Sequence, residues 1–413
     1  MEKADKVKVL FLSYNGLLEP LVGSQVIPYL ERLNGRGFEF VLLTYEKKND
    51  LAKSGKAKIL KTRSDLFSKG IEWKYMRYHK NPKILSTLFD LFAGAIYSSY
   101  LIITRNVKMV HVRGVTPGSI MIFLSKMFRV KLIFDMRGRL AEEYVGGGLW
   151  TYNSIPFRLA KNSEDSLLKI ADAVTVLTNK HLEYNKKIPF LSCRNIPMEA
   201  IPCCVDLEKF NYAAKDEDGF KKSLGLAGKF VFMYPGKIGS FYLMDQMLDF
   251  FEAVYSEMSN AIFFILTPEN AGSVLKKASE HGIAGDAIRV LEGSCFEEMP
   301  KYYRIADSGI FFINSHEKIG SSPIKMGEFL ASGVPVVINA GIGDTAEIVT
   351  DNNVGVVIKD FTVPSYEEAA RRLLSLKQEG EVLRKRCRDV AERYLSVEKG
   401  VEKYYKIYRG LIK

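Results

Sequence analysis

The sequence has only five cysteines, and no two of them have the spacing of paired metal ligands. The adjacent Cys203 and Cys204 favour buried packing over redox chemistry, and a reduced, cytosolic setting is expected. The pair Asp216-x-Asp218 has the D-x-D spacing of a carboxylate metal motif. It lies in a charged linker rather than after a buried strand, so we predict no metal site there.

Long apolar runs and leader patterns are also scarce. Residues 1–14 contain one short apolar run and no cleavage-site pattern, which predicts a first strand rather than a signal peptide. Residues 84–103 approach membrane-spanning length but include Asp90 and several Ser, Thr and Tyr residues. We expect this segment to be a core helix, with membrane docking as the second interpretation and a transmembrane span as the last.

Positive charge is distributed unevenly along the chain. Residues 1–200 hold 32 Lys and Arg against 18 Asp and Glu, whereas residues 201–413 hold 27 against 30. A basic half implies an anionic partner, namely a membrane surface, a phosphate-bearing acceptor or nucleic acid. No DNA- or RNA-binding motif accompanies the charge, so nucleic acid is not expected. Residues 47–83 are the most basic stretch of the chain. This stretch is either a solvated helix and loop or a lipid-facing patch.

Buried strands and helices alternate along the 413 residues, which is enough chain for two domains. Continuous apolar runs predict strands buried on both faces, as in doubly wound parallel sheets. The expected strands are 6–14, 38–45, 107–112, 131–136, 171–177, 230–234, 261–266, 288–291, 308–313, 334–338 and 354–357. A helix is expected to begin at Ser24, after a loop that ends with Gly23.

The segment 321–337, SSPIKMGEFLASGVPVV, has the parts of a ligand site at a helix start. Ser321 and Ser322 are candidate caps, Pro323 suits the first turn, and the helix should end near residue 332. The N-terminus of a helix favours phosphate. Lys325 and Glu328 are three residues apart and share a helix face, which suits a phosphate and a sugar hydroxyl respectively. The alternative is an ordinary capped helix packed on a sheet.

Pro323, Lys325, Glu328 and Gly333, followed by Val-Pro-Val-Val, resemble the donor motif of family 4 glycosyltransferases, in its S-P-x-K-x-x-E variant. The resemblance implies that Glu328 binds the nucleotide ribose. Family members usually carry a second Glu eight residues earlier, where this chain has Gly320, and Glu317 is the nearest carboxylate.

The same resemblance assigns roles elsewhere in the chain. Lys237 matches a basic residue on the donor diphosphate, and Gly23 lies in a loop that faces the donor. Many members have a His where this chain has Arg137, and we expect Asp135 and Arg137 to take its place beside the transferred sugar. Gly343 opens a further helix whose backbone N–H groups suit phosphate. The predicted catalytic residues are Asp135, Arg137 and Glu317, and the predicted donor-binding residues are Gly23, Lys237, Ser322, Lys325, Glu328 and Gly343.

The alternating strands and helices predict two doubly wound, Rossmann-like α/β domains, and the resemblance implies the GT-B class, in which two such domains face a cleft. Residues 1–205 with 396–413 would bind the acceptor, and 206–395 the donor. The expected activity is retaining transfer of a hexose or N-acetylhexosamine from a nucleotide-diphosphate sugar to a lipid-linked or surface-polysaccharide acceptor, without cofactor or metal. The alternatives are a nucleotide-sugar epimerase and transfer to a soluble acceptor. The expected location is cytoplasmic, at the inner face of the plasma membrane.

Overall fold

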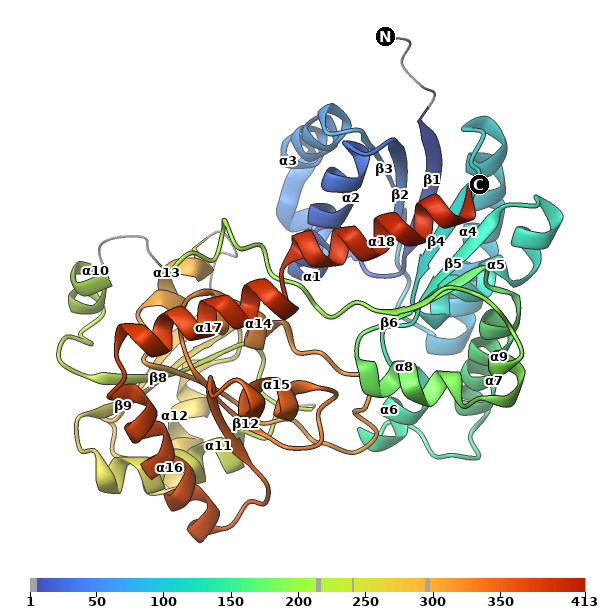
Figure 1. Ribbon diagram of the computed structural model, residues 1–413. Coiled ribbons are helices and arrows are strands. Elements are labelled where there is room, and N and C mark those ends of the chain that lie inside the picture. The colour runs from blue at the N-terminus through green and yellow to red at the C-terminus, as the bar shows by residue number, and fades with distance from the viewer. Residues whose placement is uncertain (1–5, 213–216, 240, 294–297, 413) are drawn as a thin grey trace. The chain divides into compact units, whose positions relative to one another are not determined.

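The computed structural model describes residues 6–212, 217–239, 241–293 and 298–412. These residues form two compact units (Figure 1): unit 1 is Met1–Pro202 with Val397–Lys413, and unit 2 is Cys203–Ser396. The chain therefore leaves unit 1 once and returns to it with its last helix. Asp216 of the D-x-D pair and Cys295, one of the five cysteines, lie outside the described residues.

Unit 1 is built on a seven-stranded sheet in which all neighbouring strands are parallel. The central strands are apolar and buried on both faces, as expected for a sheet with helices on each side. In spatial order the strands are β3 (Ile71–Arg77), β2 (Phe38–Glu46), β1 (Val7–Ser13), β4 (Met109–Arg113), β5 (Lys131–Asp135), β6 (Ala173–Val176) and β7 (Met198–Ala200).

The helices of unit 1 connect these strands, and the final helix of the chain joins them. Their beginnings follow the usual capping chemistry: Ser154 and Thr178 each accept a backbone N–H from the first turn of the helix that follows. The helices are α1 (Pro20–Gln25), α2 (Ile27–Asn34), α3 (Lys48–Ser68), α4 (Lys83–Thr104), α5 (Val115–Met127), α6 (Leu140–Gly146), α7 (Ile155–Ile170), α8 (Asn179–Lys186), α9 (Pro189–Ser192) and α18 (Val397–Leu411).

Unit 2 repeats the architecture with a six-stranded parallel sheet. In spatial order its strands are β10 (Ile288–Glu292), β9 (Ala261–Thr267), β8 (Phe230–Pro235), β11 (Ser308–Phe311), β12 (Val336–Asn339) and β13 (Gly355–Ile358). Its helices are α10 (Glu217–Ser223), α11 (Met244–Glu257), α12 (Ala271–Glu280), α13 (Met299–Arg304), α14 (Ile324–Ala331), α15 (Thr345–Asp351), α16 (Val363–Lys377) and α17 (Glu381–Tyr394).

The predicted fold class, two doubly wound parallel sheets, is confirmed, and every predicted strand overlaps an observed one. Two strands were missed. β3 lies inside the basic stretch 47–83, where Ile71 and Trp73 are buried on alternate positions of an otherwise half-exposed strand. β7 is only three residues long. Short or half-polar edge strands give a weak sequence signal.

Two helix predictions need correction. The helix expected from Ser24 is two helices, because the backbone leaves the helical region at Val26, and Gly23 lies inside α1 rather than before it. The segment 84–103 is helical but is not a core helix. Only 28% of the window within Leu85–Thr104 is buried, although this helix is long and apolar enough to span a membrane.

Candidate functional site

Unit 2 has its topological switch point between β8 and β11, where the strand order reverses. In open parallel sheets, ligands bind outside the carboxyl ends of the strands at such a point. Three segments lie at this edge: residues 236–239 and 241–243 after β8, residues 312–323 after β11, and residues 340–344 after β12. The start of α14 follows the second of these segments.

Hydrogen bonds tie these segments together. The Leu243 N–H donates to the Phe312 carbonyl at 2.9 Å, and the Asn314 N–H donates to the Phe241 carbonyl at 2.8 Å. The buried Asn339 side chain accepts from the Ile313 N–H and donates to its carbonyl, both at 2.8 Å. The loops at this edge therefore form a fixed frame, which suits a preorganised site.

Lys325, in the first turn of α14, reaches across this edge. Its Nζ donates to the Tyr242 hydroxyl at 2.7 Å and lies 3.9 Å from the centre of the Tyr242 ring. A Cβ on residue 236 would lie 2.9 Å from Nζ and would displace it, and the positive φ of 140° favours glycine at this position. The ammonium group is thus held beside the end of β8, where a phosphate would meet it.

Glu328 lies one turn further along α14 and is 7% exposed. Its Oε2 accepts a hydrogen bond from the hydroxyl of Tyr303 in α13. Burial raises the pKa of Glu328, although the Tyr303 hydroxyl and the Lys325 charge oppose the shift. A carboxylate has two oxygens with about four acceptor positions, so Glu328 retains acceptor capacity for further hydroxyl groups beside that of Tyr303.

Four other predicted residues, three donor-binding and one catalytic, lie on the segments that follow β8, β11 and β12. Lys237, directly after β8, is exposed, and Glu317 is half-buried with a positive φ of 56°. Ser322 does not cap α14, whose N-cap is Pro323; its Oγ accepts from the Cys203 N–H at 3.1 Å. The Gly343 N–H donates to the Lys318 carbonyl at 2.9 Å, so this N–H is already used. The structure therefore brings Lys237, Lys325 and Glu328 to one edge and gives Ser322 and Gly343 supporting contacts within the protein.

Three residues at this edge were not predicted from the sequence: Tyr242, Tyr303 and Lys318. Lys318 is 4% exposed, and its Nζ lies 3.7 Å from the centre of the Phe241 ring. Lys318 therefore lies over the ring of Phe241, and Lys325 lies over the ring of the adjacent Tyr242. The negative face of an aromatic ring attracts a cation in this position. The only sequence signal was this aromatic pair a few residues after Lys237.

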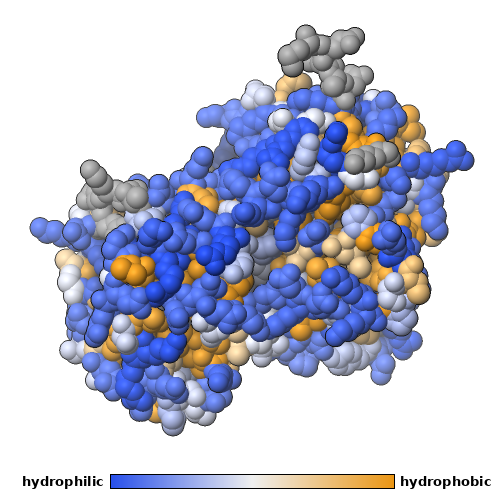
Figure 2. Space-filling model, viewed as in Figure 1, coloured by the Kyte–Doolittle hydropathy of each residue, from blue (hydrophilic) through white to orange (hydrophobic). Residues whose placement is uncertain are grey.

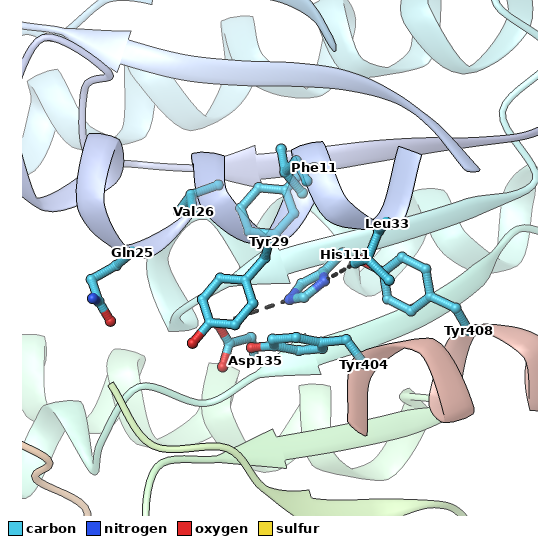
Figure 3. Close-up of a pocket in the computed structure, with 10 residues that line it drawn as sticks. Phe11, Gln25, Val26, Tyr29, Leu33, His111, Asp135, Tyr404 and Tyr408 are labelled. Carbon is cyan, nitrogen blue, oxygen red and sulfur yellow. Dashed lines mark hydrogen bonds and ion pairs between the residues drawn. The ribbon is translucent and has the colours of Figure 1, made fainter. Parts of the chain in front are cut away.

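In unit 1 the switch point lies between β1 and β4, and Asp135 ends the next strand, β5. Figure 3 shows Asp135 in a small pocket lined by Phe11 of β1, Tyr29 of α2, His111 of β4, and Tyr404 and Tyr408 of α18. The His111 Nδ1 lies 2.6 Å from the Tyr408 hydroxyl, and its Nε2 lies 3.8 Å from Asp135 Oδ2. The pocket is internal and lies between α18 and the sheet of unit 1.

Asp135 also lies 3.5 Å from Arg137 Nη1 and accepts from the Thr175 hydroxyl at 3.0 Å. Burial alone would raise the pKa of Asp135, but Arg137 and His111 outweigh it and hold that pKa below its ordinary value. Burial lowers the pKa of His111. Asp135 is therefore charged, and it orients the side chain of Arg137, which is 17% exposed.

The loop before α1 has an anchor that the sequence did not reveal. Glu46, fully buried at the end of β2, accepts from the N–H groups of Leu17 at 2.6 Å and Leu18 at 3.2 Å, and from the Thr44 hydroxyl at 2.6 Å. Burial raises the pKa of Glu46, and these three hydrogen bonds oppose the shift. The Gly23 segment thus begins from a fixed loop.

Within the described ranges, no group of three or more His, Cys, Asp and Glu side chains is arranged to hold a metal ion. The cations and the carboxylate at the switch point of unit 2 are the charged groups that a ligand would meet at that edge.

Known structures share the whole fold at low sequence identity. Sucrose-phosphate synthase (tll1590) from Thermosynechococcus elongatus is 14% identical, with a TM-score of 0.75 over 98% of this chain and 99% of that chain. A glycosyltransferase from Rickettsia africae ESF-5 is 15% identical, with a TM-score of 0.71 over 99% and 100%. Anabaena Alr3699/HepE in complex with UDP and glucose is 13% identical, with a TM-score of 0.70 over 98% and 99%. No curated protein matches the sequence.

One family model matches the sequence, over residues 216–393, and its description is glycosyl transferases group 1. This range covers nearly all of unit 2, including α14 with Lys325 and Glu328. The protein therefore has the fold of its GT-B glycosyltransferase neighbours, and its second unit is similar to group 1 glycosyl transferases.

Proposed function

We propose that this protein is a retaining glycosyltransferase that takes a sugar from a nucleotide-diphosphate donor bound at the switch point of unit 2. The observation that carries the proposal is the pair on α14. Lys325 is fixed by Tyr242 beside the end of β8, and one turn later Glu328 is buried with a tyrosine partner. A fixed cation suits the diphosphate, and a buried carboxylate with remaining acceptor capacity suits the ribose hydroxyls.

The proposed reaction needs little covalent chemistry from the protein. The bond between the anomeric carbon and the diphosphate oxygen breaks, and the acceptor oxygen bonds to the same carbon on the same face. The acceptor proton passes to the departing phosphate oxygen. Lys325 and Lys237 stabilise the negative charge that develops on the diphosphate, which is usually the largest contribution of such a site. In this proposal these lysines take the place of a metal, and no cofactor takes part.

The other predicted site residues keep their roles as part of this proposal. In unit 1, Arg137 contacts the transferred sugar and the buried Asp135 orients it, as their 3.5 Å contact supports. Glu317 supplies the carboxylate that the family 4 motif places eight residues before Glu328. Gly23, Ser322 and Gly343 shape the donor-side loops.

Two structural neighbours support the proposed donor and acceptor classes. Anabaena Alr3699/HepE has been solved with UDP and with UDP-glucose. WaaG, a glycosyltransferase involved in lipopolysaccharide biosynthesis, has a TM-score of 0.67 and is 14% identical. We propose family 4 membership, a hexose or N-acetylhexosamine donor, a lipid-linked or surface-polysaccharide acceptor, and a cytoplasmic location at an anionic membrane surface.

A thermal-shift screen with UDP, GDP, ADP and their sugars tests the donor site. We expect one nucleoside diphosphate and its sugar to raise the melting temperature of the wild type, and to do so without divalent metal in EDTA. Failure of every nucleotide to shift the wild type would overturn the proposal. An NMR assignment of the product anomer tests retention. Conversion of the donor sugar without any acceptor would instead identify an epimerase.

A further inference from the structure

Helix α4 differs from an ordinary surface helix because its exposed face is apolar and its buried face includes polar residues. Its inward face carries polar residues: Ser86, Asp90 and Ser98 are 0–6% exposed. Asp90 accepts hydrogen bonds from the Tyr14 hydroxyl at 3.2 Å and from the His79 N–H at 3.0 Å. The side of the helix that packs on unit 1 therefore buries polar groups together with the apolar Leu101 and Ile102.

The outward face of α4 is apolar. Its exposed large side chains recur every three or four residues, so they form one stripe along the helix. Between residues 85 and 103 every exposed position belongs to this stripe, and no charged side chain interrupts it. Its members are Leu85 (66% exposed), Leu88 (54%), Phe89 (58%), Phe92 (68%), Ile96 (58%), Tyr100 (53%) and Ile103 (66%).

The apolar surface continues onto α5, which packs against α4. Phe123 and Met127, one turn apart on α5, are 80% and 63% exposed. We call the α4 stripe together with Phe123 and Met127 the α4–α5 face. In Figure 2, hydrophobic atoms interrupt the hydrophilic surface on the side of unit 1 where Figure 1 places α4 and α5. Exposed apolar side chains gathered on two packed helices mark an interaction site.

The charge around this face identifies its partner. Residues 77–134 contain nine Lys and Arg and a single acidic residue, the buried Asp90. Exposed cations lie near both ends of α4: Arg77 and Lys80 precede it, and Lys108 follows it. Lys126 and Arg129 lie at the end of α5. An apolar face with flanking cations and no exposed carboxylate complements an anionic lipid surface.

We propose that the α4–α5 face docks on an anionic bilayer, with α4 lying in the plane of the interface and its stripe inserted among the acyl chains. Spanning is not possible without unfolding, because Leu101 and Ile102 are buried and Asp90 is hydrogen-bonded within unit 1. This inference rests on the proposed location at a membrane surface, but it requires neither a sugar donor nor transfer. The basic helix α3 contributes only long-range attraction.

Vesicle co-sedimentation with a triple variant tests the face. Phe89→Gln, Phe92→Gln and Ile96→Gln change side chains that are more than half exposed, so they leave the core of unit 1 unaltered. With vesicles of phosphatidylcholine and phosphatidylglycerol, we expect the triple variant to bind at least tenfold more weakly than the wild type. The matched control is Val363→Gln with Val382→Gln, two apolar side chains of unit 2 that are 63% and 65% exposed. The control pair should bind as the wild type does, and equal binding by the triple variant would overturn the inference.

Salt separates insertion from simple attraction. The Debye length falls from about 10 Å at 0.1 M salt to about 3 Å at 1 M. Insertion predicts that the wild type retains binding in 1 M salt that the triple variant lacks, whereas complete loss by the wild type would show attraction alone. A Phe92→Trp variant should be quenched by brominated lipid, and absence of quenching would contradict insertion.

Two further measurements distinguish other outcomes. Sedimentation velocity without vesicles should show a wild-type monomer. A wild-type dimer that the triple variant abolishes, together with no vesicle binding, would assign the face to self-association instead. Nucleotide thermal shifts, recorded in parallel, report the donor site of unit 2. If the triple variant loses vesicle binding but still binds nucleotide, only the docking face has been affected. If the wild type binds vesicles but no nucleotide, the donor proposal alone is refuted.

Discussion

Each unit has a buried carboxylate at its candidate site, Asp135 in unit 1 and Glu328 in unit 2, and the surroundings of these two carboxylates differ in charge. Asp135 of unit 1 lies beside Arg137 and His111, which hold its pKa below the ordinary value. Glu328 of unit 2 has the Tyr303 hydroxyl and a more distant Lys325, and burial raises its pKa. Asp135 is therefore compensated within the protein, whereas Glu328 retains capacity for an external partner. The first arrangement suits a structural anchor and the second a binding group.

The largest effect expected from this contrast is on the stability of unit 1. Asp135→Asn should lower the free energy of unfolding at pH 7 by about 3–5 kcal/mol, because it removes one member of a buried ion pair. The pKa of Asp135 is lower in the folded state than the ordinary value of about 3.9. Its contribution is therefore complete above that value and is lost as the pH falls through the lower, folded pKa.

Urea unfolding followed by circular dichroism measures this loss. Glu183→Gln is the control, because the Glu183–Lys186 pair is exposed on α8 and should leave the midpoint unchanged. If Asp135→Asn were as stable as the wild type at pH 7, Asp135 would not be the anchor of unit 1.

The cation of unit 2 should affect catalysis rather than stability. Lys325→Met should lower kcat by about 10²–10³-fold, which corresponds to about 2.7–4 kcal/mol of lost charge stabilisation in the transition state. Initial rates of transfer measure this effect, with Tyr242→Phe as the control that keeps the ring and removes one hydrogen bond. A Lys325→Met enzyme with unchanged kcat would place the diphosphate elsewhere.

Glu328→Gln should weaken nucleotide binding by about 1.5–3 kcal/mol, which is the range for a hydrogen bond to a charged group. Its effect on folding should have the opposite sign. The pKa of Glu328 is higher in the folded state than its ordinary value, so ionisation of Glu328 opposes folding above that pKa. The Gln variant, which does not ionise, should therefore be at least as stable as the wild type at neutral pH.

Calorimetric titration measures the expected loss of nucleotide affinity, and urea unfolding measures the stability of the variant. A Glu328→Gln protein that binds nucleotide normally would exclude the ribose role. A variant that unfolds more easily would show that Glu328, like Asp135, is a structural group.

The smallest effect is expected from Tyr303→Phe, at about 1 kcal/mol in nucleotide affinity, because one hydrogen bond is removed from Glu328. That hydrogen bond lowers the pKa of Glu328, so the pKa should rise further in the variant. Affinity should therefore fall more at pH 6 than at pH 8. Tyr302→Phe is the neighbouring control, and a pH-independent loss in Tyr303→Phe would indicate a packing effect only.

Much of the fold was predictable because its signals are local. Continuous apolar runs marked β1 and β9, and the helix signals around Pro323 located α14. The edge strand β3 was missed because its half-polar pattern follows a long basic helix. The helical content of residues 84–103 was predictable, but its orientation was not. The side that packs depends on Tyr14 and His79, which come from other segments.

The donor motif was predictable from its own residues, but the groups that fix it were not. Lys325 meets Tyr242 across 83 residues of sequence, and Glu328 meets Tyr303 across 25. In unit 1, His111 meets Tyr408 across 297. Contacts of this kind depend on the register of parallel strands and on the return of α18, neither of which has a local pattern. Family resemblance supplied roles for Lys237 and Glu328 but none for the supporting tyrosines.

The return of α18 to unit 1 has a consequence for how the protein is synthesised. Strands β1 to β7 leave the ribosome first, yet the helix that covers Phe38 and His111 is translated last. At about 5–20 residues per second, nearly two hundred residues of unit 2 separate these events by roughly 10–40 s. During that interval the nascent first unit exposes an apolar groove, while unit 2, an uninterrupted segment, is free to complete its own core. The later part of the chain can therefore finish folding before the earlier part.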